Sequence, residues 1–241
     1  MRHVLYTLLL MLLLVMAMVS SATVEVTPVP SDTPLPIQPT NPQELIHVKG
    51  CLENLESLPY EDLWFLNQND ARLSESTLIF VDKTERKAML FSEGKLIHNE
   101  KTGQPACWKI ALGITPQRTH PIGPKTRRGD RKTPEGWYRT SDRPQSDYHG
   151  ALLVHYPNPF DAKHGLDTER INQSQYQAIV NAEKNGQTPL QNTRLGSDIL
   201  LHGGGSSRDW TWGCIGFENQ DIDALRMLLP ENKQTNILIV P

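Results

Sequence analysis

A histidine and a cysteine stand at the two ends of a glycine-rich segment in this 241-residue chain. The segment is LLHGGGSSRDWTWGCIGF, residues 200–217, and it holds His202 and Cys214. A cysteine that attacks an acyl group needs a base to form its thiolate and backbone N–H groups to stabilise the oxyanion. The pattern predicts that Cys214 is a nucleophile and His202 its base. The alternatives are a buried core cysteine and a structural histidine.

The residues around the pair fit the same chemistry. Gly203 follows the histidine and Gly213 precedes the cysteine, and glycine lets backbone approach other groups closely because it has no Cβ. We expect the N–H groups of Gly213 and Cys214 to form the oxyanion hole and Thr211 to brace the turn. Trp212 either forms a wall of the cleft or simply packs.

The segment resembles the catalytic motif of the L,D-transpeptidases, the YkuD-type domain of bacterial cell-wall enzymes. The HG pair at 202–203 matches the first half of that motif, and TWGCI at 211–215 matches the second. Trp212 stands where most members carry a second histidine, and Gly216 where many carry arginine or asparagine. These departures resemble a branch of the family with a DWTxGCI-type signature.

The resemblance covers roughly residues 78–241, through an opening hairpin, a GDRKTPEG segment and a YPN segment. It implies a mostly β (α+β), β-sandwich-like catalytic domain over residues 76–241, with the cysteine at the edge of a cleft. It also implies that a backbone carbonyl of residues 203–205 orients His202. Lys125 and Tyr156 become candidates for lining the substrate cleft.

The periodicity of the chain predicts many short strands and few helices. Apolar, β-branched or aromatic runs bounded by turn residues are typical of strands. Helical spacing over 172–185 ends at Gly186, and a second helix over 219–229 ends at Pro230. The expected strands are Thr77–Val81, Ala88–Phe91, Lys95–His98, Trp108–Leu112, Trp137–Thr140, Leu152–Tyr156, Asp198–His202 and Asn236–Val240.

The N-terminal 75 residues divide into three parts. Residues 1–22 have a positive start, an apolar run and a small-residue cleavage site, which is the pattern of a signal peptide. An uncleaved anchor is the alternative. Residues 23–43 form a Pro-rich linker, and 44–75 a short helical segment that we expect to pack on the catalytic domain. Export to the periplasm or cell envelope follows, with membrane contact only through the N-terminal segment.

Export changes what the three cysteines imply. An odd count in an oxidising compartment suggests that one thiol stays free. If Cys51 pairs with Cys107, the free thiol is Cys214. The alternative is that Cys51 and Cys107 are small buried apolar residues.

The composition and charge of the chain limit the classes of partner that we expect. The net charge of −3 gives no global basic signal for nucleic acid, so no nucleic-acid partner is expected. The histidines lack metal-ligand spacing, and no metal or cofactor is expected. The basic run KTRRGDRK, residues 125–132, is either a lip that meets carboxylates or a solvated loop, and a solvated loop is the expectation for Arg127 and Arg128.

The resemblance implies acyl transfer on peptidoglycan stem peptides through a thioester, in cell-wall remodelling. The acceptor is a stem-peptide amine or a wall-linked protein. One alternative is a hydrolase of the same family, either an L,D-carboxypeptidase or an amidase that cleaves wall crosslinks or wall-protein links. Another is an inactive wall-binding module. Papain-like and NlpC-like peptidases place the cysteine before the histidine, and this chain has the opposite order.

Overall fold

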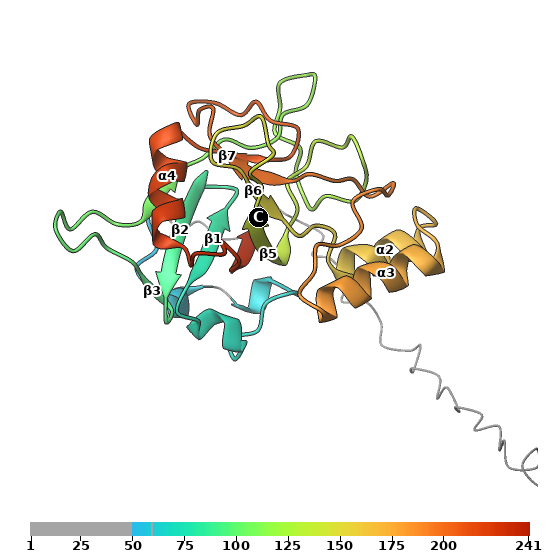
Figure 1. Ribbon diagram of the computed structural model, residues 1–241, viewed down its shortest axis with the longest axis horizontal. Helices are drawn as coiled ribbons and strands as arrows, with labels where there is room; N and C mark the ends of the chain where they lie inside the picture. Colours follow the sequence, from blue (N-terminus) through green and yellow to red (C-terminus); the bar gives the residue numbers. More distant parts are fainter. Residues whose placement is uncertain (1–49, 59) are drawn as a thin grey trace, which may run out of the picture. The chain divides into compact units, whose positions relative to one another are not determined.

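The computed structural model describes residues 50–58 and 60–241, so the expected signal peptide, the linker and the start of the helical segment lie outside it. A mixed sheet runs in the order β3-β2-β1-β9-β5-β6-β7-β8, with β4 paired to β2 (Figure 1). The strands are β1 Leu78–Asp82, β2 Lys87–Ser92, β3 Lys95–Leu96, β4 Cys107–Lys109, β5 Gly136–Asp142, β6 Leu152–Val154, β7 Leu200–His202, β8 Ile215–Gly216 and β9 Asn236–Val240.

The central strand β1 is covered on both faces. It pairs with β9 in parallel and with β2 in antiparallel fashion. Side chains alternate along a strand, so Ile79 and Val81 join one apolar cluster while Leu78 and Phe80 join another. Double coverage explains why this strand reads as a nearly continuous apolar run.

The sheet curls at β5, which pairs with β9 over residues 136–139 and with β6 over residues 140–142. The curl places Leu152 and Leu201 of the second half in one buried cluster with Ile79 and Ile237 of the first. Two sheet halves that enclose a shared core confirm the β-sandwich-like, mostly β fold.

Strand β4 ends earlier than the expected Trp108–Leu112 because the chain changes partners. After pairing with β2, it crosses to the other half of the sheet. There Ala111 exchanges two backbone hydrogen bonds of 2.8 Å with Gly216. This crossing joins the segment after β4 directly to the strand that follows Cys214.

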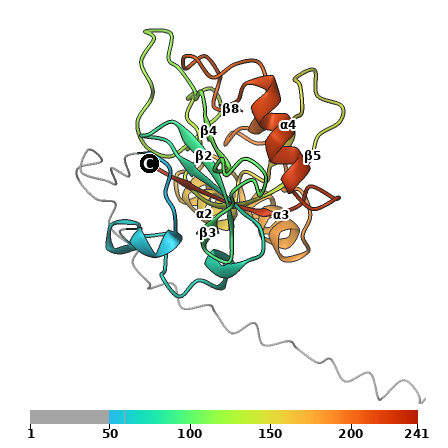
Figure 2. The same cartoon turned by 90° about the vertical axis from the view of Figure 1, so that its left-hand side faces the viewer.

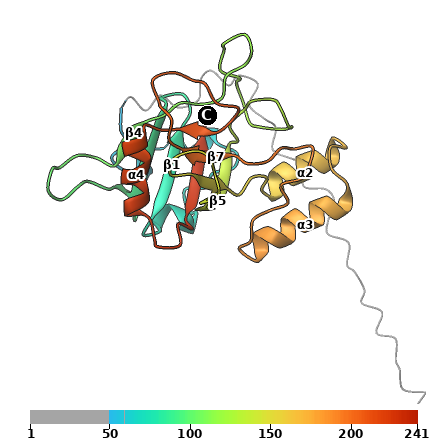
Figure 3. The ribbon, with the colours of Figure 1, turned by 45° about the horizontal axis from the view of Figure 1, so that its top comes forward.

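Of the α-helices in the described residues, two agree with the sequence. Helix α3, Gln173–Lys184, begins at a capping box between Asn172 and Gln175, and α4, Asn219–Leu228, ends before Pro230. Helix α2, Pro159–Asp167, was not expected. It is short, and its Gly165 is a weak helix former; a Cβ there would lie 2.7 Å from Leu195 Cδ2. Helices α2 and α3 lie side by side at one end of the sheet and α4 at the other (Figure 3), and all three contribute to the same apolar cluster.

Over residues 50–58 and 60–75, the expected short helical segment forms 3-10 helices. They span Leu55–Ser57, Tyr60–Asp62 and Ala71–Ser74. The segment lies beside β3 and covers the sheet face that carries Leu78, Phe80 and Phe91, called here the outer face (Figure 2). Its buried leucines are Leu52, Leu55, Leu58, Leu63, Leu66 and Leu73. The expectation that this segment packs on the catalytic domain is confirmed.

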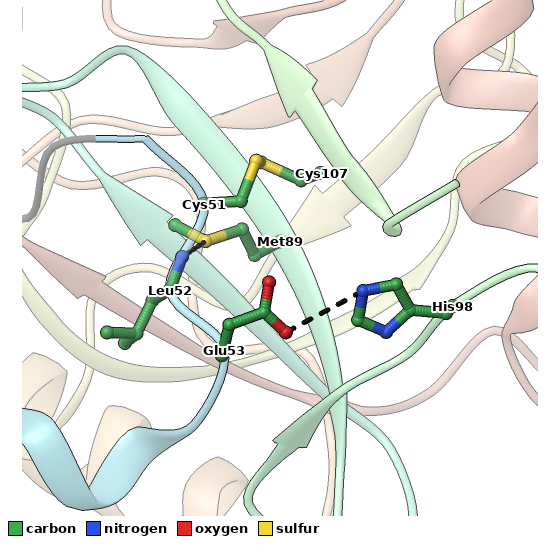
Figure 4. Close-up of a disulfide and its surroundings, with 6 residues drawn as sticks. All are labelled: Cys51, Leu52, Glu53, Met89, His98 and Cys107. Carbon is green, nitrogen blue, oxygen red and sulfur yellow. Dashed lines mark hydrogen bonds and ion pairs between the residues drawn. A yellow bond between two sulfur atoms is a disulfide. The ribbon is translucent and has the colours of Figure 1, made fainter. Parts of the chain in front are cut away.

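A disulfide joins Cys51 to Cys107 with a Cα–Cα distance of 6.1 Å (Figure 4). Next to it, the Leu52 N–H donates to the sulfur of Met89 at 3.2 Å. Cys214 is the free thiol. Of the two alternatives left by the sequence, the structure has the disulfide.

Within residues 50–58 and 60–241, no helix has the length and apolar character needed to cross a membrane.

Candidate active site

Strand register places the proposed nucleophile and base on one sheet face. Strands β7 and β8 are parallel, with Leu201 opposite Ile215 and His202 opposite Gly216. Leu201 and Ile215 point into the main core. Because side chains alternate, His202 and Cys214 lie on the opposite face. By the same register Cys214 lies opposite Leu200, two residues before His202. In extended strands the Cα atoms of His202 and Cys214 are therefore about 8 Å apart.

The imidazole of His202 is held in one tautomer. Its Nδ1 lies 2.6 Å from the Gly203 carbonyl oxygen, which fixes the ring proton on Nδ1 and leaves the Nε2 lone pair as a base. The side chain is buried, and burial lowers the pKa of His202, so the ring is neutral at neutral pH. The expected orienting carbonyl is present.

Gly203 must be glycine for this arrangement. Its N–H donates to the His149 carbonyl at 2.8 Å. A Cβ at this position would lie 2.3 Å from Asn219 Oδ1, the atom that accepts the next backbone N–H, from Gly204. The glycine therefore allows the loop to pass between His149 and the start of α4.

Two aromatic side chains enclose the imidazole. Tyr148 stacks on His202 with ring centroids 4.1 Å apart, and Trp210 meets it edge-on at 5.5 Å. The indole N–H of Trp210 donates to the Gly205 carbonyl. Tyr148 was missed in the sequence because it lies in a distant loop with no motif around it. Trp210 lies within the DWT signature, which is the signal that could have found it.

The thiol of Cys214 is protonated at rest. It packs partly buried beside Leu153 and Leu200, and its S–H donates to the Asp198 carbonyl at 3.5 Å. Burial raises the pKa of Cys214 to about 11, and the Asp198 carboxylate adds to this rise. Among the described contacts, no hydrogen bond joins the sulfur to His202. The resting pair is a neutral thiol and a neutral imidazole.

Thr211 braces the turn before Cys214, as expected. Its hydroxyl donates to the Cys214 carbonyl at 2.7 Å and accepts the Gly213 N–H at 3.2 Å. The second bond corrects the expected oxyanion hole, because the Gly213 N–H is already occupied. Gly213 has φ +120°, and a Cβ there would lie 2.6 Å from the Lys132 carbonyl. Trp212 is 70% exposed, with the Arg131 guanidinium 4.2 Å from its ring.

Lys125 and Tyr156 do not line an open surface, which corrects that expectation. Lys125 forms a buried ion pair of 2.8 Å with Asp130. The Tyr156 hydroxyl donates to the Leu195 carbonyl at 3.2 Å inside the core. Both residues fix the loops behind the site.

Asp209 is not a third member of a catalytic triad. Its carboxylate pairs with Arg86 at 2.8 Å and accepts the Leu112 N–H at 2.8 Å. These bonds tie the 203–214 loop to the turn between β1 and β2 and to the segment after β4. The acid therefore positions the loop that carries the cysteine.

The sequence model of the L,D-transpeptidase catalytic domain, YkuD, matches residues 76–237. The chain belongs to this family. The match includes His202 and Cys214 and also the whole curled sheet except its last residues.

Individual proteins match shorter or more divergent stretches. "Putative L,D-transpeptidase YafK" of Escherichia coli (strain K12) is 43% identical over 49 residues, which are 19% of this chain and 20% of that protein. The helical cell shape determining protein Pgp2 of Campylobacter jejuni has 20% identity and a TM-score of 0.42, covering 71% of this chain and 51% of that one. Bd1075 of Bdellovibrio bacteriovorus has 24% identity and a TM-score of 0.37, covering 72% and 50%.

Proposed function

We propose that this L,D-transpeptidase domain transfers the acyl group of a peptidoglycan stem peptide through a thioester on Cys214. The observation that carries the proposal is the placement of Cys214 and His202 on one sheet face. The hydrogen bond from Nδ1 to Gly203 supports it, because it leaves Nε2 able to accept a proton. Membership of the family supplies the substrate class.

The first half-reaction forms the thioester. The thiol turns from the Asp198 carbonyl toward the imidazole, and Nε2 of His202 accepts its proton as sulfur attacks the amide carbonyl carbon. The Cys214 N–H stabilises the oxyanion. The C–N bond then breaks, and the imidazolium returns the proton to the leaving D-amino acid.

The second half-reaction releases the acyl group. An amine from another stem peptide, or from a wall-linked protein, attacks the thioester carbonyl, and the C–S bond breaks to give an amide and the thiol. Water in place of the amine gives a carboxylic acid, and the same site is then a hydrolase. The acceptor decides between the two activities.

The test is the product spectrum of the full chain with tetrapeptide muropeptides, read by liquid chromatography and mass spectrometry. Transfer gives crosslinked dimers, and hydrolysis gives tripeptides. We expect Cys214→Ala to give neither product, and His202→Gln to lose about 10²- to 10⁴-fold in rate. Unchanged muropeptides with folded wild-type protein would favour the wall-binding module instead.

We also propose that the protein acts outside the cytoplasmic membrane, in the periplasm or cell envelope. The signal-like pattern of residues 1–22 and the disulfide both support this location. N-terminal sequencing of native material should start near Thr23. A native chain that begins at Met1 in the soluble cytosol would contradict export.

A further inference from the structure

A hollow of about 460 Å³ is lined by four arginines, and its lining includes neither His202 nor Cys214. Its walls come from the loop before β5, the turn between α2 and α3 with the start of α3, and the loop between α3 and β7. The lining residues are Arg127, Arg128, Arg170, Gln175, Asn192, Thr193 and Arg194. The expectation that Arg127 and Arg128 belong to a merely solvated loop did not foresee this convergence.

The arginines of the hollow are not paired with carboxylates within the described part of the chain. None of its four arginines forms an ion pair there, and its lining contains no carboxylate. Other arginines do pair with carboxylates, namely Arg72, Arg86, Arg139, Arg143 and Arg226. The nearby Asp130 carboxylate is buried against Lys125. Four guanidinium groups gathered without an anion repel one another.

The walls of the hollow are fixed before any ligand binds. The Arg128 N–H donates to the Arg194 carbonyl at 2.8 Å, and Arg128 Nε donates to the Thr193 carbonyl at 3.3 Å. Arg170 Nη1 donates to Thr168 Oγ1 at 2.6 Å. The two Arg128 bonds join the loop before β5 to the loop between α3 and β7, and the side-chain bonds hold two of the guanidinium groups in place. Such preorganisation reduces the entropy lost on binding.

We propose that this hollow binds a phosphate-class anion, either a phosphate monoester or a diphosphate. The planar guanidinium fork matches the oxygens of phosphate bidentately. Four positive charges are better balanced by a dianion than by one carboxylate. Gln175 and Asn192 add neutral hydrogen-bonding residues to the lining. The inference stands independently of the chemistry at Cys214.

Isothermal titration calorimetry at constant ionic strength tests the proposal with inorganic phosphate and pyrophosphate as probes. The full chain should bind at least one of them saturably at one site. Arg170→Gln combined with Arg194→Gln should weaken binding tenfold or more, since hydrogen bonds to charged groups each contribute that order. The matched control, Arg118→Gln with Arg208→Gln, removes two exposed arginines outside the hollow and should change affinity less than twofold.

Thermal unfolding separates lost binding from lost folding. Without phosphate, the Arg170/Arg194 double variant should melt at or above the wild-type Tm, because repulsion is relieved. With phosphate, the wild type should gain Tm and the variant should not. Cys214→Ala should bind phosphate as the wild type does. The absence of saturable binding of both probes, or equal weakening in the control pair, would overturn the proposal.

Binding to vesicles distinguishes a lipid headgroup from a soluble compound as the source of the phosphate. Co-sedimentation with phosphatidylcholine vesicles that contain phosphatidic acid, competed by inorganic phosphate and lost in the double variant, indicates a lipid headgroup. Binding of the soluble probes without co-sedimentation indicates a soluble phosphate compound. Both results support the same chemistry in the hollow.

Discussion

His202 depends on its neighbours for the properties of a base. The Gly203 carbonyl sets its tautomer, and Tyr148 and Trp210 shield it from water. Shielding keeps the ring neutral because the charged form loses hydration. Tyr148 acts through the histidine and is therefore a positioning residue.

Replacement of Tyr148 should raise the pKa of His202. In Tyr148→Ala, water reaches the imidazole and its pKa should move up toward the ordinary value for histidine, whereas Tyr148→Phe keeps the stacked ring and the lowered pKa. NMR titration of the histidine ring nitrogens measures this shift. His155 is an internal control, since burial beside Ser141 lowers its pKa to about 4 in both variants. An unchanged His202 titration in Tyr148→Ala would contradict the shielding role.

The raised pKa of Cys214 makes a further prediction at this scale. With a pKa of about 11, the thiolate fraction should rise about tenfold for each pH unit between pH 7 and 9. Iodoacetamide alkylation of the native protein, followed by intact mass, should show that slope without a plateau. A rate that levels off below pH 8 would mean a thiolate–imidazolium pair at rest, contrary to the neutral pair described above.

At the scale of elements, the turn that carries Cys214 is held by contacts that only glycine permits. Gly213 has φ +120° and faces the Lys132 carbonyl, and Gly113 allows still closer packing against the Arg131 carbonyl. The GDRKTPEG loop therefore packs directly behind the nucleophile. The loop holds the cysteine in position, and the buried ion pair between Lys125 and Asp130 fixes the loop in turn.

Gly213→Ala should destabilise the protein more than Gly129→Ala. Both positions have positive φ, but the added Cβ meets backbone only at Gly213, while Gly129 has open space. We expect a loss in the free energy of unfolding of about 3 kcal/mol at Gly213 and about 1 kcal/mol at Gly129. Urea unfolding measures both values. Equal losses would show that the Lys132 carbonyl yields to the methyl group.

Strand and helix positions could be predicted where one local signal decides them. Helix α3 has its capping box and Gly186, and β1 has a continuous apolar run. The crossing of Ala111 to Gly216 could not be predicted, because hydrogen-bond partners depend on how the sheet curls. The same limit hid Tyr148 from the candidate site and made Lys125 look like a surface residue.

At the scale of the whole molecule, the disulfide fastens the leucine-rich segment to the sheet. Cys51 precedes the 3-10 turns and Cys107 begins β4, so the bond closes a loop of sequence separation 56. The turns also bury their leucines on the outer sheet face. Packing and the disulfide together keep one face of strands β1, β2 and β9 covered, while β7 and β8 in the other half of the sheet carry the site.

Removal of the disulfide should cost about 4 kcal/mol in the free energy of unfolding, from the chain entropy of the open loop. Cys51→Ser with Cys107→Ser, compared with the oxidised wild type in urea unfolding, measures the loss. Cys214→Ser is the matched control and should unfold like the wild type. Thiol counting under denaturing, non-reducing conditions should find one thiol, at Cys214. A count of three would contradict the disulfide.

The central claim is a thioester on Cys214, and mapping of the acyl group on the protein tests it most directly. The full chain is mixed with a tetrapeptide muropeptide, quenched in acid and digested, and the modified peptide is sequenced by mass spectrometry. We predict an adduct equal to the donor minus its terminal D-amino acid, on Cys214, absent in Cys214→Ala and accumulating more slowly in His202→Gln. Product formation by Cys214→Ala, or an adduct on any other residue, would contradict the account.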